Sequence, residues 1–251
     1  MDRGGRWRVS RAKLSSGDSQ VTDASDLLLP ASIERRRLMV DRQVRTFDVT
    51  DQVITGRLLE VPRELFVDEG QQSLAYSDTA IELSGDAGPR ARTLLPPFIL
   101  ARMLQAAEPQ PTDRALDIAG GTGYTAALLA GLVAEVVAVE TDGALFARAK
   151  AAFASLGLKT ISPLSISVSK LGADLGPFDL IIVNGCVEDR LPALADLLSP
   201  KGRIVAIVPK PSGMTMAALI SGKRDDLSVR PLFDAQAPVI EEFRRAPEFA
   251  F

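Results

Sequence analysis

The stretch that decides the fold is Arg114-Ala115-Leu116-Asp117-Ile118-Ala119-Gly120-Gly121-Thr122-Gly123-Tyr124. Its apolar first half predicts a short buried strand that ends at Ile118, and the glycines predict a tight turn. We expect a helix over residues 125–132 and a second strand over residues 135–139, followed by the acid Glu140. Glycines let backbone N–H groups approach a ligand closely, and a helix N-terminus favours negative charge. The unit therefore predicts a nucleotide-type binding site.

The turn and the acid together leave more than one nucleotide open. Glu140 stands about twenty residues beyond the turn, where an acid can accept hydrogen bonds from ribose hydroxyls. The segment from Gly121 to Ala126 also satisfies the G-x-G-x-x-A pattern of NAD- and FAD-binding proteins. The turn alone therefore does not identify the ligand.

Two residues favour S-adenosylmethionine over a dinucleotide. Asp117 lies in the strand ahead of the turn, where a dinucleotide site normally has apolar residues, and an acid there can face the α-amino group of a methionine moiety. Ala119 stands where a first glycine is usual. Because S-adenosylmethionine carries no phosphate, its turn need not approach a pyrophosphate and can tolerate this alanine.

Composition limits the class of function. The 251 residues are 46% hydrophobic with a formal net charge of -3, which is ordinary for one α/β core with an N-terminal extension. No domain-wide basic charge is present, so we expect no nucleic acid as the main partner. The sequence contains no histidine, which removes His-based metal sites, Ser-His triads and imidazole acids, and we expect no metal.

Cysteine usage and hydropathy bear on location. Cys186 is the single cysteine, which excludes an intramolecular disulfide and fits a reducing cytoplasm. Without a histidine to activate it, we expect Cys186 to be a small buried residue at a strand end and not a nucleophile. No apolar run is long enough to span a bilayer, and the basic N-terminus has no apolar stretch after it, so we expect neither a membrane segment nor a secretory signal.

The first half of the chain is expected to be helical. Residues 1–30 lack periodicity and are expected to be disordered or loosely attached. Residues 31–112 are expected to form a helical region that includes the substrate lid, and residues 113–251 the cofactor-binding core. Apolar spacing and proline positions predict helices within 30–45, 51–61 and 94–109, and a short strand is possible over 79–83.

The second half alternates between strands and helices, which is typical of a parallel sheet covered on both faces. Expected strands cover 114–118, 135–140, 158–162, 178–183 and 203–208, and expected helices 125–132, 143–156 and 192–198. Residues 214–220 and 227–233 flank a polar turn and predict a hairpin. The expected fold is a Rossmann-like class I methyltransferase α/β fold, with a mostly parallel seven-stranded sheet, a C-terminal antiparallel hairpin and an N-terminal helical extension.

Two segments are more specific than the glycine turn, Met39-Val40-Asp41-Arg42-Gln43-Val44-Arg45 and Val61-Pro62-Arg63-Glu64-Leu65-Phe66-Val67. Two shorter segments accompany them, Val49-Thr50-Asp51 and Leu74-Ala75-Tyr76-Ser77-Asp78. With the turn and Glu140, they follow the order found in the protein-L-isoaspartate O-methyltransferase family, which roughly residues 33–210 resemble. The resemblance implies methyl transfer from S-adenosylmethionine to the carboxylate of isoaspartyl residues, a protein-repair reaction.

The resemblance also implies a set of site residues. Glu140 would bind the ribose, and Thr93 matches the threonine of the family's Gln-Thr-Ile-Ser segment, which covers the cofactor and contacts the substrate. The methionine end of the cofactor would be held by Asp117, Ala119, Gly120, Gly121, Thr122, Gly123 and Tyr124.

Several positions depart from the family pattern. Leu95 replaces a serine associated with the family's active site. The acid of the family's Gly-Asp-Gly segment, which helps to hold the adenine, is absent, so Leu164 and Ser165 would line the adenine instead. Asn184 follows the fourth core strand, in a loop where the family has small residues, and is a candidate for polar contacts near the methyl group.

Other basic residues near the lid allow two explanations. Arg90, Arg92 and Arg102 can meet a substrate carboxylate, although solvated surface charges are the commoner explanation.

We therefore interpret the chain as a cytoplasmic, S-adenosylmethionine-dependent O-methyltransferase that acts on proteins or peptides bearing isoaspartate. Two alternatives stay open: the same chemistry on a different, unidentified small acceptor because of Leu95, and a cofactor-binding protein without catalysis. An NAD(P)-dependent oxidoreductase is opposed by Asp117 and by the C-terminal hairpin. The sequence does not give the oligomeric state.

Overall fold

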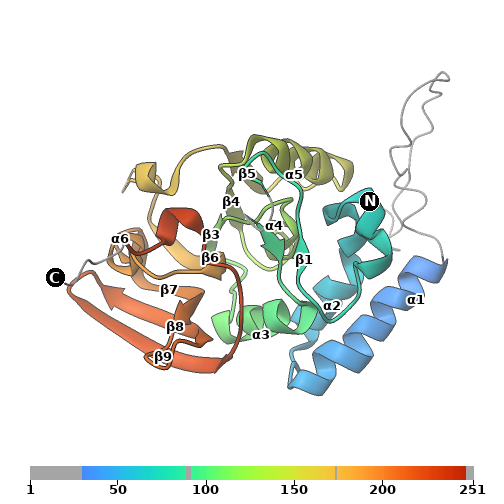
Figure 1. Cartoon of the computed structure of the whole chain (residues 1–251), viewed down its shortest axis with the longest axis horizontal. Helices are drawn as coiled ribbons and strands as arrows, with labels where there is room; N and C mark the ends of the chain where they lie inside the picture. Colours follow the sequence, from blue (N-terminus) through green and yellow to red (C-terminus); the bar gives the residue numbers. More distant parts are fainter. Residues whose placement is uncertain (1–29, 89–91, 173, 247–251) are drawn as a thin grey trace.

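The computed structural model describes residues 30–88, 92–172 and 174–246, and a seven-stranded sheet lies at its centre (Figure 1). The strand order is β5-β4-β3-β6-β7-β8-β9. The strands are β3 (Arg114–Ile118), β4 (Glu135–Val139), β5 (Ile161–Leu164), β6 (Phe178–Cys186), β7 (Leu198–Pro209), β8 (Thr215–Lys223) and β9 (Asp226–Asp234). Neighbouring strands from β5 to β7 are parallel, whereas β8 and β9 are antiparallel. The predicted parallel sheet with a C-terminal hairpin is confirmed.

Side chains of the inner strands alternate between two hydrophobic clusters, one on each face of the sheet. Ala115 and Leu180 belong to one cluster, with residues of α3 (Pro97–Ala107), α4 (Tyr124–Leu129) and α5 (Gly143–Ser155). Leu116 and Ile181 belong to the other, with residues of α6 (Leu191–Ala195) and of the 3-10 helices η6 (Val168–Lys170) and η7 (Glu241–Phe243). Both faces are therefore covered, as parallel sheets require.

The helices of the N-terminal region pack against the hydrophobic cluster that contains Ala115 and Leu180. α1 (Pro30–Met39) is followed by a π-helical turn η2 (Val40–Val44), a 3-10 turn η3 (Arg45–Phe47) and α2 (Gln52–Glu60). Asp51 caps α2, because its carboxylate accepts hydrogen bonds from the N–H groups of Val53 at 2.7 Å and Ile54 at 3.1 Å. Short 3-10 helices η4 (Arg63–Phe66) and η5 (Glu69–Leu74) lead on towards the lid. No helix in the described part of the chain is long and apolar enough to cross a membrane.

Several element boundaries differ from the sequence predictions; β7, for example, begins at Leu198 and not at residue 203. The helix expected to reach residue 45 is α-helical only to Met39, since the N–H of Arg45 bonds to the carbonyl of Val40 and widens the turn. The strand expected from residue 158 begins at Ile161, because the N–H of Leu158 still bonds to the carbonyl of Phe153 at the end of α5. The tail predicted over residues 1–30 lies outside the described residues except for its last position.

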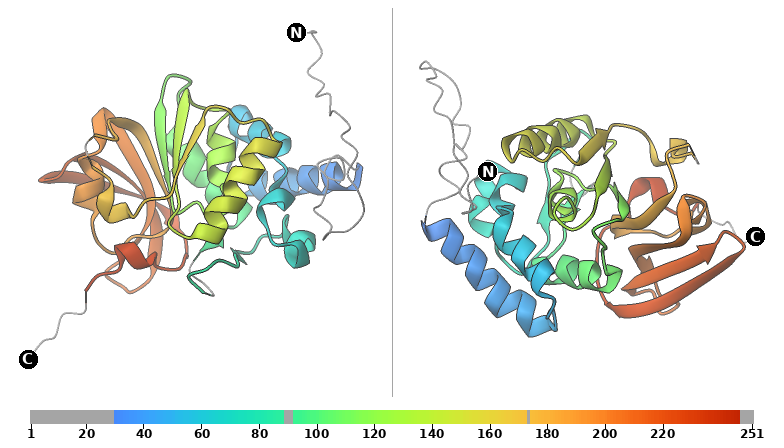
Figure 2. Two further views of the ribbon diagram at one scale, coloured as in Figure 1. Left: turned by 90° about the horizontal axis from the view of Figure 1, so that it is seen from above. Right: turned by 180° about the vertical axis from the view of Figure 1, so that it is seen from behind.

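A two-stranded sheet and a short 3-10 helix lie near the carboxyl ends of the central strands (Figure 2). β1 (Ile81–Glu82) and β2 (Thr93–Leu94) pair antiparallel in the segment expected to act as the lid. After β9 the chain returns to the end of β6, where Val239 forms a parallel bridge with Cys186. The following helix η7, drawn in red, comes to lie beside the carboxyl ends of β6 and β3.

Candidate functional site

The glycine turn after β3 uses left-handed backbone conformations at three positions. The φ angles are 55° at Ala119, 60° at Gly121 and 91° at Gly123. Glycine adopts these angles without strain, whereas Ala119 adopts its angle at a steric cost. Gly120 is required for another reason, since a Cβ at this position would overlap the Oδ2 atom of Asp117. The turn thus keeps open the space beside that carboxylate.

Asp117 is a buried acid with one oxygen unpaired. Its Oδ1 accepts a hydrogen bond from the side-chain amide of Asn184 at 2.6 Å, whereas Oδ2 is buried and has no hydrogen-bond partner among the described residues. Burial raises the pKa of Asp117 to about 7, although the hydrogen bond from Asn184 acts in the opposite direction. A buried carboxylate oxygen without a donor is costly, so Asp117 is suited to accept from a cationic ligand group.

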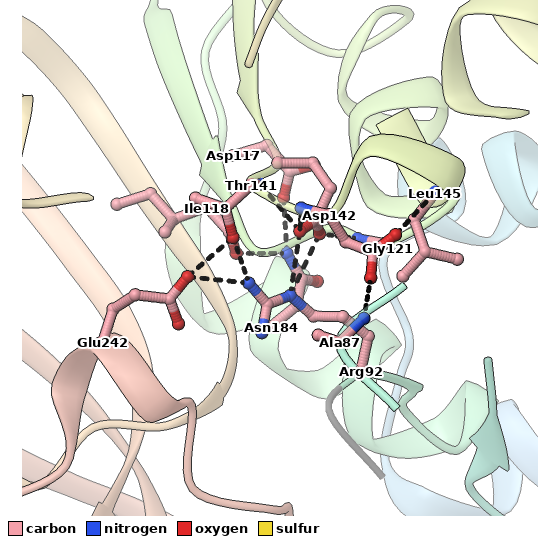
Figure 3. Close-up of polar contacts among 11 residues, drawn as sticks. Ala87, Arg92, Asp117, Ile118, Gly121, Thr141, Asp142, Leu145, Asn184 and Glu242 are labelled. Atoms are coloured by element: carbon pink, nitrogen blue, oxygen red, sulfur yellow. Dashed lines mark hydrogen bonds and ion pairs between the residues drawn. The ribbon is translucent and has the colours of Figure 1, made fainter. Parts of the chain in front are cut away.

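Asn184 lies near the end of β6 and is turned towards Asp117 (Figure 3). Its Nδ2 also donates to the carbonyl of Ile118 at 3.0 Å, and its Oδ1 accepts from the hydroxyl of Thr125 at 2.5 Å. These three bonds fix the orientation of the amide. The described contacts of Asn184 therefore serve Asp117.

Glu140, directly after β4, is surrounded by donors, and three of the donor residues, Arg92, Gly121 and Thr141, are labelled in Figure 3. Its Oε1 accepts from the backbone N–H groups of Thr141 at 2.8 Å and Asp142 at 3.0 Å, and its Oε2 accepts from Gly121 N–H at 2.8 Å. The Nε atom of Arg92 lies 3.1 Å from both oxygens. The N–H of Gly121, expected to face a ligand, is thus bonded to the acid of the next strand.

Arg92 is not a solvated surface charge, and that explanation was wrong for this residue. Its side chain is only 6% exposed, and its Nη2 donates to Thr141 Oγ1 at 2.9 Å and to Glu242 Oε1 at 3.1 Å. Burial alone would lower the pKa of Arg92, but Glu140 and Glu242 together raise it. No motif pointed to Glu242, which comes from η7 near the end of the chain.

The other arginines near the lid lie elsewhere. Arg102 places its guanidinium over the ring of Phe233, 3.8 Å from the ring centroid. Arg90 lies outside the described residues.

The two residues expected at the adenine end adjoin Glu140. The backbone N–H of Glu140 donates to the carbonyl of Leu164 at 3.2 Å, at the end of β5. Leu164 is half-buried and Ser165 is exposed. The structure thus brings Leu164 and Ser165 to the strand end next to the expected ribose position.

The lid residues are buried. The hydroxyl of Thr93 is buried without a hydrogen-bond partner. Leu95 is 2% exposed and belongs to the hydrophobic cluster of the N-terminal helices. Its carbonyl accepts a hydrogen bond from the fully buried Arg63 at 2.7 Å. The structure therefore offers a free hydroxyl at Thr93 and a packed apolar side chain at Leu95.

Tyr124 and Thr122 face the N-terminal region. The ring of Tyr124 is fully buried, 5.4 Å from the ring of Phe66 and 4.8 Å from the guanidinium carbon of Arg63. The hydroxyl of Thr122 donates to the carbonyl of Phe66 at 2.5 Å. The side chains of Tyr124 and Thr122 thus anchor the turn to η4, which leaves their backbone atoms as the groups that can face a ligand.

Cys186 is buried, as the sequence predicted, and burial raises the pKa of its thiol to about 11. Within residues 30–88, 92–172 and 174–246, no three Cys, Asp or Glu side chains group as metal ligands.

The residues present fit S-adenosylmethionine. The unpaired oxygen of Asp117 suits the α-ammonium group, and Gly120 leaves that oxygen uncovered. Glu140 stands one strand further along, where an acid can accept hydrogen bonds from ribose hydroxyls.

Comparisons with known proteins identify a family that matches most of the chain. The model of the family described as protein-L-isoaspartate(D-aspartate) O-methyltransferase matches residues 34–233. A protein-L-isoaspartate O-methyltransferase of Koribacter versatilis is 37% identical over 188 residues, which is 75% of this chain and 82% of that protein. One of Methanoregula boonei is 35% identical over 197 residues, 78% of this chain and 86% of that protein.

Two solved structures share the fold. A protein-L-isoaspartate O-methyltransferase superimposes with a TM-score of 0.70 at 23% identity, over 82% of this chain and 65% of that chain. A putative enzyme of the same name from Plasmodium falciparum, in complex with S-adenosyl-L-homocysteine, gives a TM-score of 0.69 at 19% identity over 83% of this chain and 98% of that chain.

Proposed function

Because the chain belongs to the protein-L-isoaspartate O-methyltransferase family, we propose that it methylates the free carboxylate of isoaspartyl residues in proteins and uses S-adenosylmethionine as the methyl donor. The observation that carries this proposal is Asp117, a buried acid whose Oδ2 has no partner and lies beside the glycine turn. An acid in this position recognises the ammonium group of the donor's methionine moiety. A pyrophosphate would instead be repelled by it.

The reaction needs no histidine. S-adenosylmethionine supplies an electrophilic methyl group on a sulfonium. The isoaspartyl carboxylate is already ionised at neutral pH, so no general base has to remove a proton. The protein therefore contributes alignment and exclusion of water.

We assign these tasks to residues of the turn and the lid. Asp117 binds the methionine ammonium group of the donor, Glu140 binds its ribose, and Asn184 orients Asp117. The hydroxyl of Thr93, buried and without a partner, donates a hydrogen bond to the acceptor carboxylate. Backbone groups of the turn, together with Leu164 and Ser165, line the remainder of the donor.

Leu95 favours an alternative methyl acceptor, other than an isoaspartyl residue. It stands where the family has a serine, and its packed apolar side chain offers no hydrogen bond to a substrate. A less polar acceptor than an isoaspartyl residue would tolerate this loss. The acceptor is thus the part of the proposal that most needs a test.

That test is transfer of labelled methyl groups to a matched pair of peptides, one isoaspartyl and one normal aspartyl, with base-labile methyl ester as the readout. Ester on the isoaspartyl peptide alone would support the proposed activity. Ester on neither peptide, with S-adenosylhomocysteine still bound, would mean that the cofactor site acts on another acceptor or on none. We place the reaction in the cytoplasm, as the single buried Cys186 suits a reducing compartment.

A further inference from the structure

The carboxylate of Glu140 has no capacity left for ribose hydroxyls in the observed arrangement. A carboxylate offers about four lone-pair positions. Glu140 already accepts from three backbone N–H groups, those of Gly121, Thr141 and Asp142, and from Arg92 Nε at both oxygens. A ribose that binds here must therefore displace one of these donors.

Arg92 is the donor that can leave. The three N–H groups belong to the backbone of the turn after β3 and of the chain after β4, which backbone bonds of Ala119 to Val139 and of Glu140 to Leu164 tie to the sheet. The guanidinium of Arg92 sits on a flexible side chain and already has other partners, Thr141 Oγ1 at 2.9 Å and Glu242 Oε1 at 3.1 Å. Release from Glu140 would therefore leave Arg92 paired.

The segment after β9 holds Glu242 in the position where it pairs with Arg92. This segment lies beyond residue 233, where the family match ends. The side chain of Phe243 is fully buried in the hydrophobic cluster that contains Leu116 and Ile181. The carbonyl of Phe243 accepts hydrogen bonds from the N–H groups of Glu188 and Asp189. Glu242 Oε1 accepts from Thr141 Oγ1 at 2.7 Å, and Oε2 is buried without a partner. Glu242 thus has an oxygen in reserve for a guanidinium that moves.

We propose that Arg92 and Glu242 set the affinity of the cofactor site by exchange: the ribose hydroxyls replace Arg92 on Glu140, and Glu242 takes over its charge. This inference rests on the proposed use of S-adenosylmethionine. It assigns a function to the C-terminal segment, and it gives the two partners of one ion pair opposite effects. Arg92 competes with the ribose, whereas Glu242 stabilises the state in which the ribose is bound.

The test is the affinity for S-adenosylhomocysteine, measured by titration calorimetry. Arg92→Gln should bind roughly tenfold more tightly than the wild type, because the competing charge is gone. Glu242→Gln should bind several-fold more weakly, because the displaced guanidinium loses its carboxylate. The double variant should match Arg92→Gln, since Glu242 acts through Arg92. For an analogue of S-adenosylhomocysteine without the ribose 2′-hydroxyl, Arg92→Gln should raise the affinity by a smaller factor.

Arg224→Gln is the matched control, because Arg224 forms an exposed ion pair with Asp196 at the hairpin. Its affinity should equal that of the wild type. Weaker binding by both Arg92→Gln and Glu242→Gln, or no binding by any variant, would overturn the exchange. Binding that follows the predicted order in a protein that forms no isoaspartyl ester would overturn the proposed acceptor and leave the exchange supported.

Discussion

The two ends of the candidate cofactor site treat their carboxylates in opposite ways. At the methionine end, Asp117 has one oxygen fixed by Asn184 and the other without a donor. At the ribose end, Glu140 accepts from four donor groups, one of which is the charged side chain of Arg92. The first end can accept a further donor without losing one, whereas the second must give up a donor to accept another. Affinity at the methionine end therefore depends on the charge of Asp117. Affinity at the ribose end depends on competition between the ribose and Arg92 for Glu140.

Replacing Asp117 is the strongest test of this contrast. Asp117→Asn keeps the shape but removes the charge, and leaving an ammonium without its buried partner costs about 3–5 kcal/mol. At pH 8 the affinity for S-adenosylhomocysteine should therefore fall by roughly two to four orders of magnitude. The free protein should become more stable, because a buried charge with a raised pKa has been removed. Calorimetric titration and thermal unfolding measure the two effects.

The control for this prediction is Asp196→Asn, which changes an exposed acid of an ion pair far from the turn. It should leave affinity unchanged. Unaltered affinity in Asp117→Asn would remove Asp117 from the cofactor site altogether.

Leu95, directly after β2, gives the next largest effect. Leu95→Ser restores the family's hydroxyl, and a recovered hydrogen bond of about 1–1.5 kcal/mol should raise kcat/KM on an isoaspartyl peptide by up to about tenfold. Because Leu95 packs in the core, the same change should cost about 2–4 kcal/mol of stability. Denaturant unfolding and methyl ester formation measure the two quantities. Leu95→Ala is the matched control: it should lose the same stability without the gain in rate, and equal rates in both variants would contradict the role given to this position.

Titration of Asp117 makes the methionine end sensitive to pH. Since the pKa of Asp117 is raised to about 7 in the folded protein, this form keeps a proton that the unfolded chain loses near pH 4. The free energy of unfolding of the free protein should therefore fall as the pH rises between these two values. Binding of S-adenosylhomocysteine should instead tighten as the pH rises through about 7, because its ammonium group needs the ionised acid.

Asn184→Ala sharpens this prediction. The hydrogen bond from Asn184 favours the ionised form of Asp117, so its loss should move the midpoint of tighter binding upward by about one pH unit. A purely structural role for Asn184 would lower affinity equally at every pH. Calorimetric titrations between pH 6 and 9 distinguish the two outcomes. Thr125→Val is a milder variant, which removes only the hydrogen bond that the Thr125 hydroxyl donates to the Asn184 amide.

The methionine end could be read from the sequence because its parts are local. The strand, the turn and Asp117 lie within a few consecutive residues, and the spacing to Glu140 follows from one strand–helix–strand unit. The same pattern predicted the sheet, since alternating strands and helices leave few arrangements. Tyr124 is the instructive exception, because its place in the motif did not reveal that its ring packs on Phe66.

The ribose end could not be completed from the sequence. Arg92 and Glu242 are separated by 150 positions, and no periodicity or spacing links them. A charged residue near a lid is usually solvated, so burial of Arg92 between two acids becomes visible only when the C-terminal segment is seen to return to β6. Such contacts depend on the tertiary fold, which local patterns do not encode.

The smallest expected effect concerns the backbone that both ends share. Ala119 begins the turn with a φ of 55°, a left-handed conformation that costs an L-residue about 1–2 kcal/mol, whereas glycine adopts it freely. Glycine also gives the unfolded chain about 0.4–1 kcal/mol of additional entropy, which offsets part of the gain. Ala119→Gly should therefore stabilise the protein by roughly 0.5–1 kcal/mol in denaturant unfolding. Affinity for S-adenosylhomocysteine should hardly change, because the N–H of residue 119 bonds to the carbonyl of Val139 at 2.9 Å and faces no ligand. Ala138→Gly, on the neighbouring strand, is the matched control and should destabilise, since strand backbone gains nothing from glycine. A loss of stability in both variants would show that the turn carries no strain at Ala119, and that its departure from glycine is neutral to the fold.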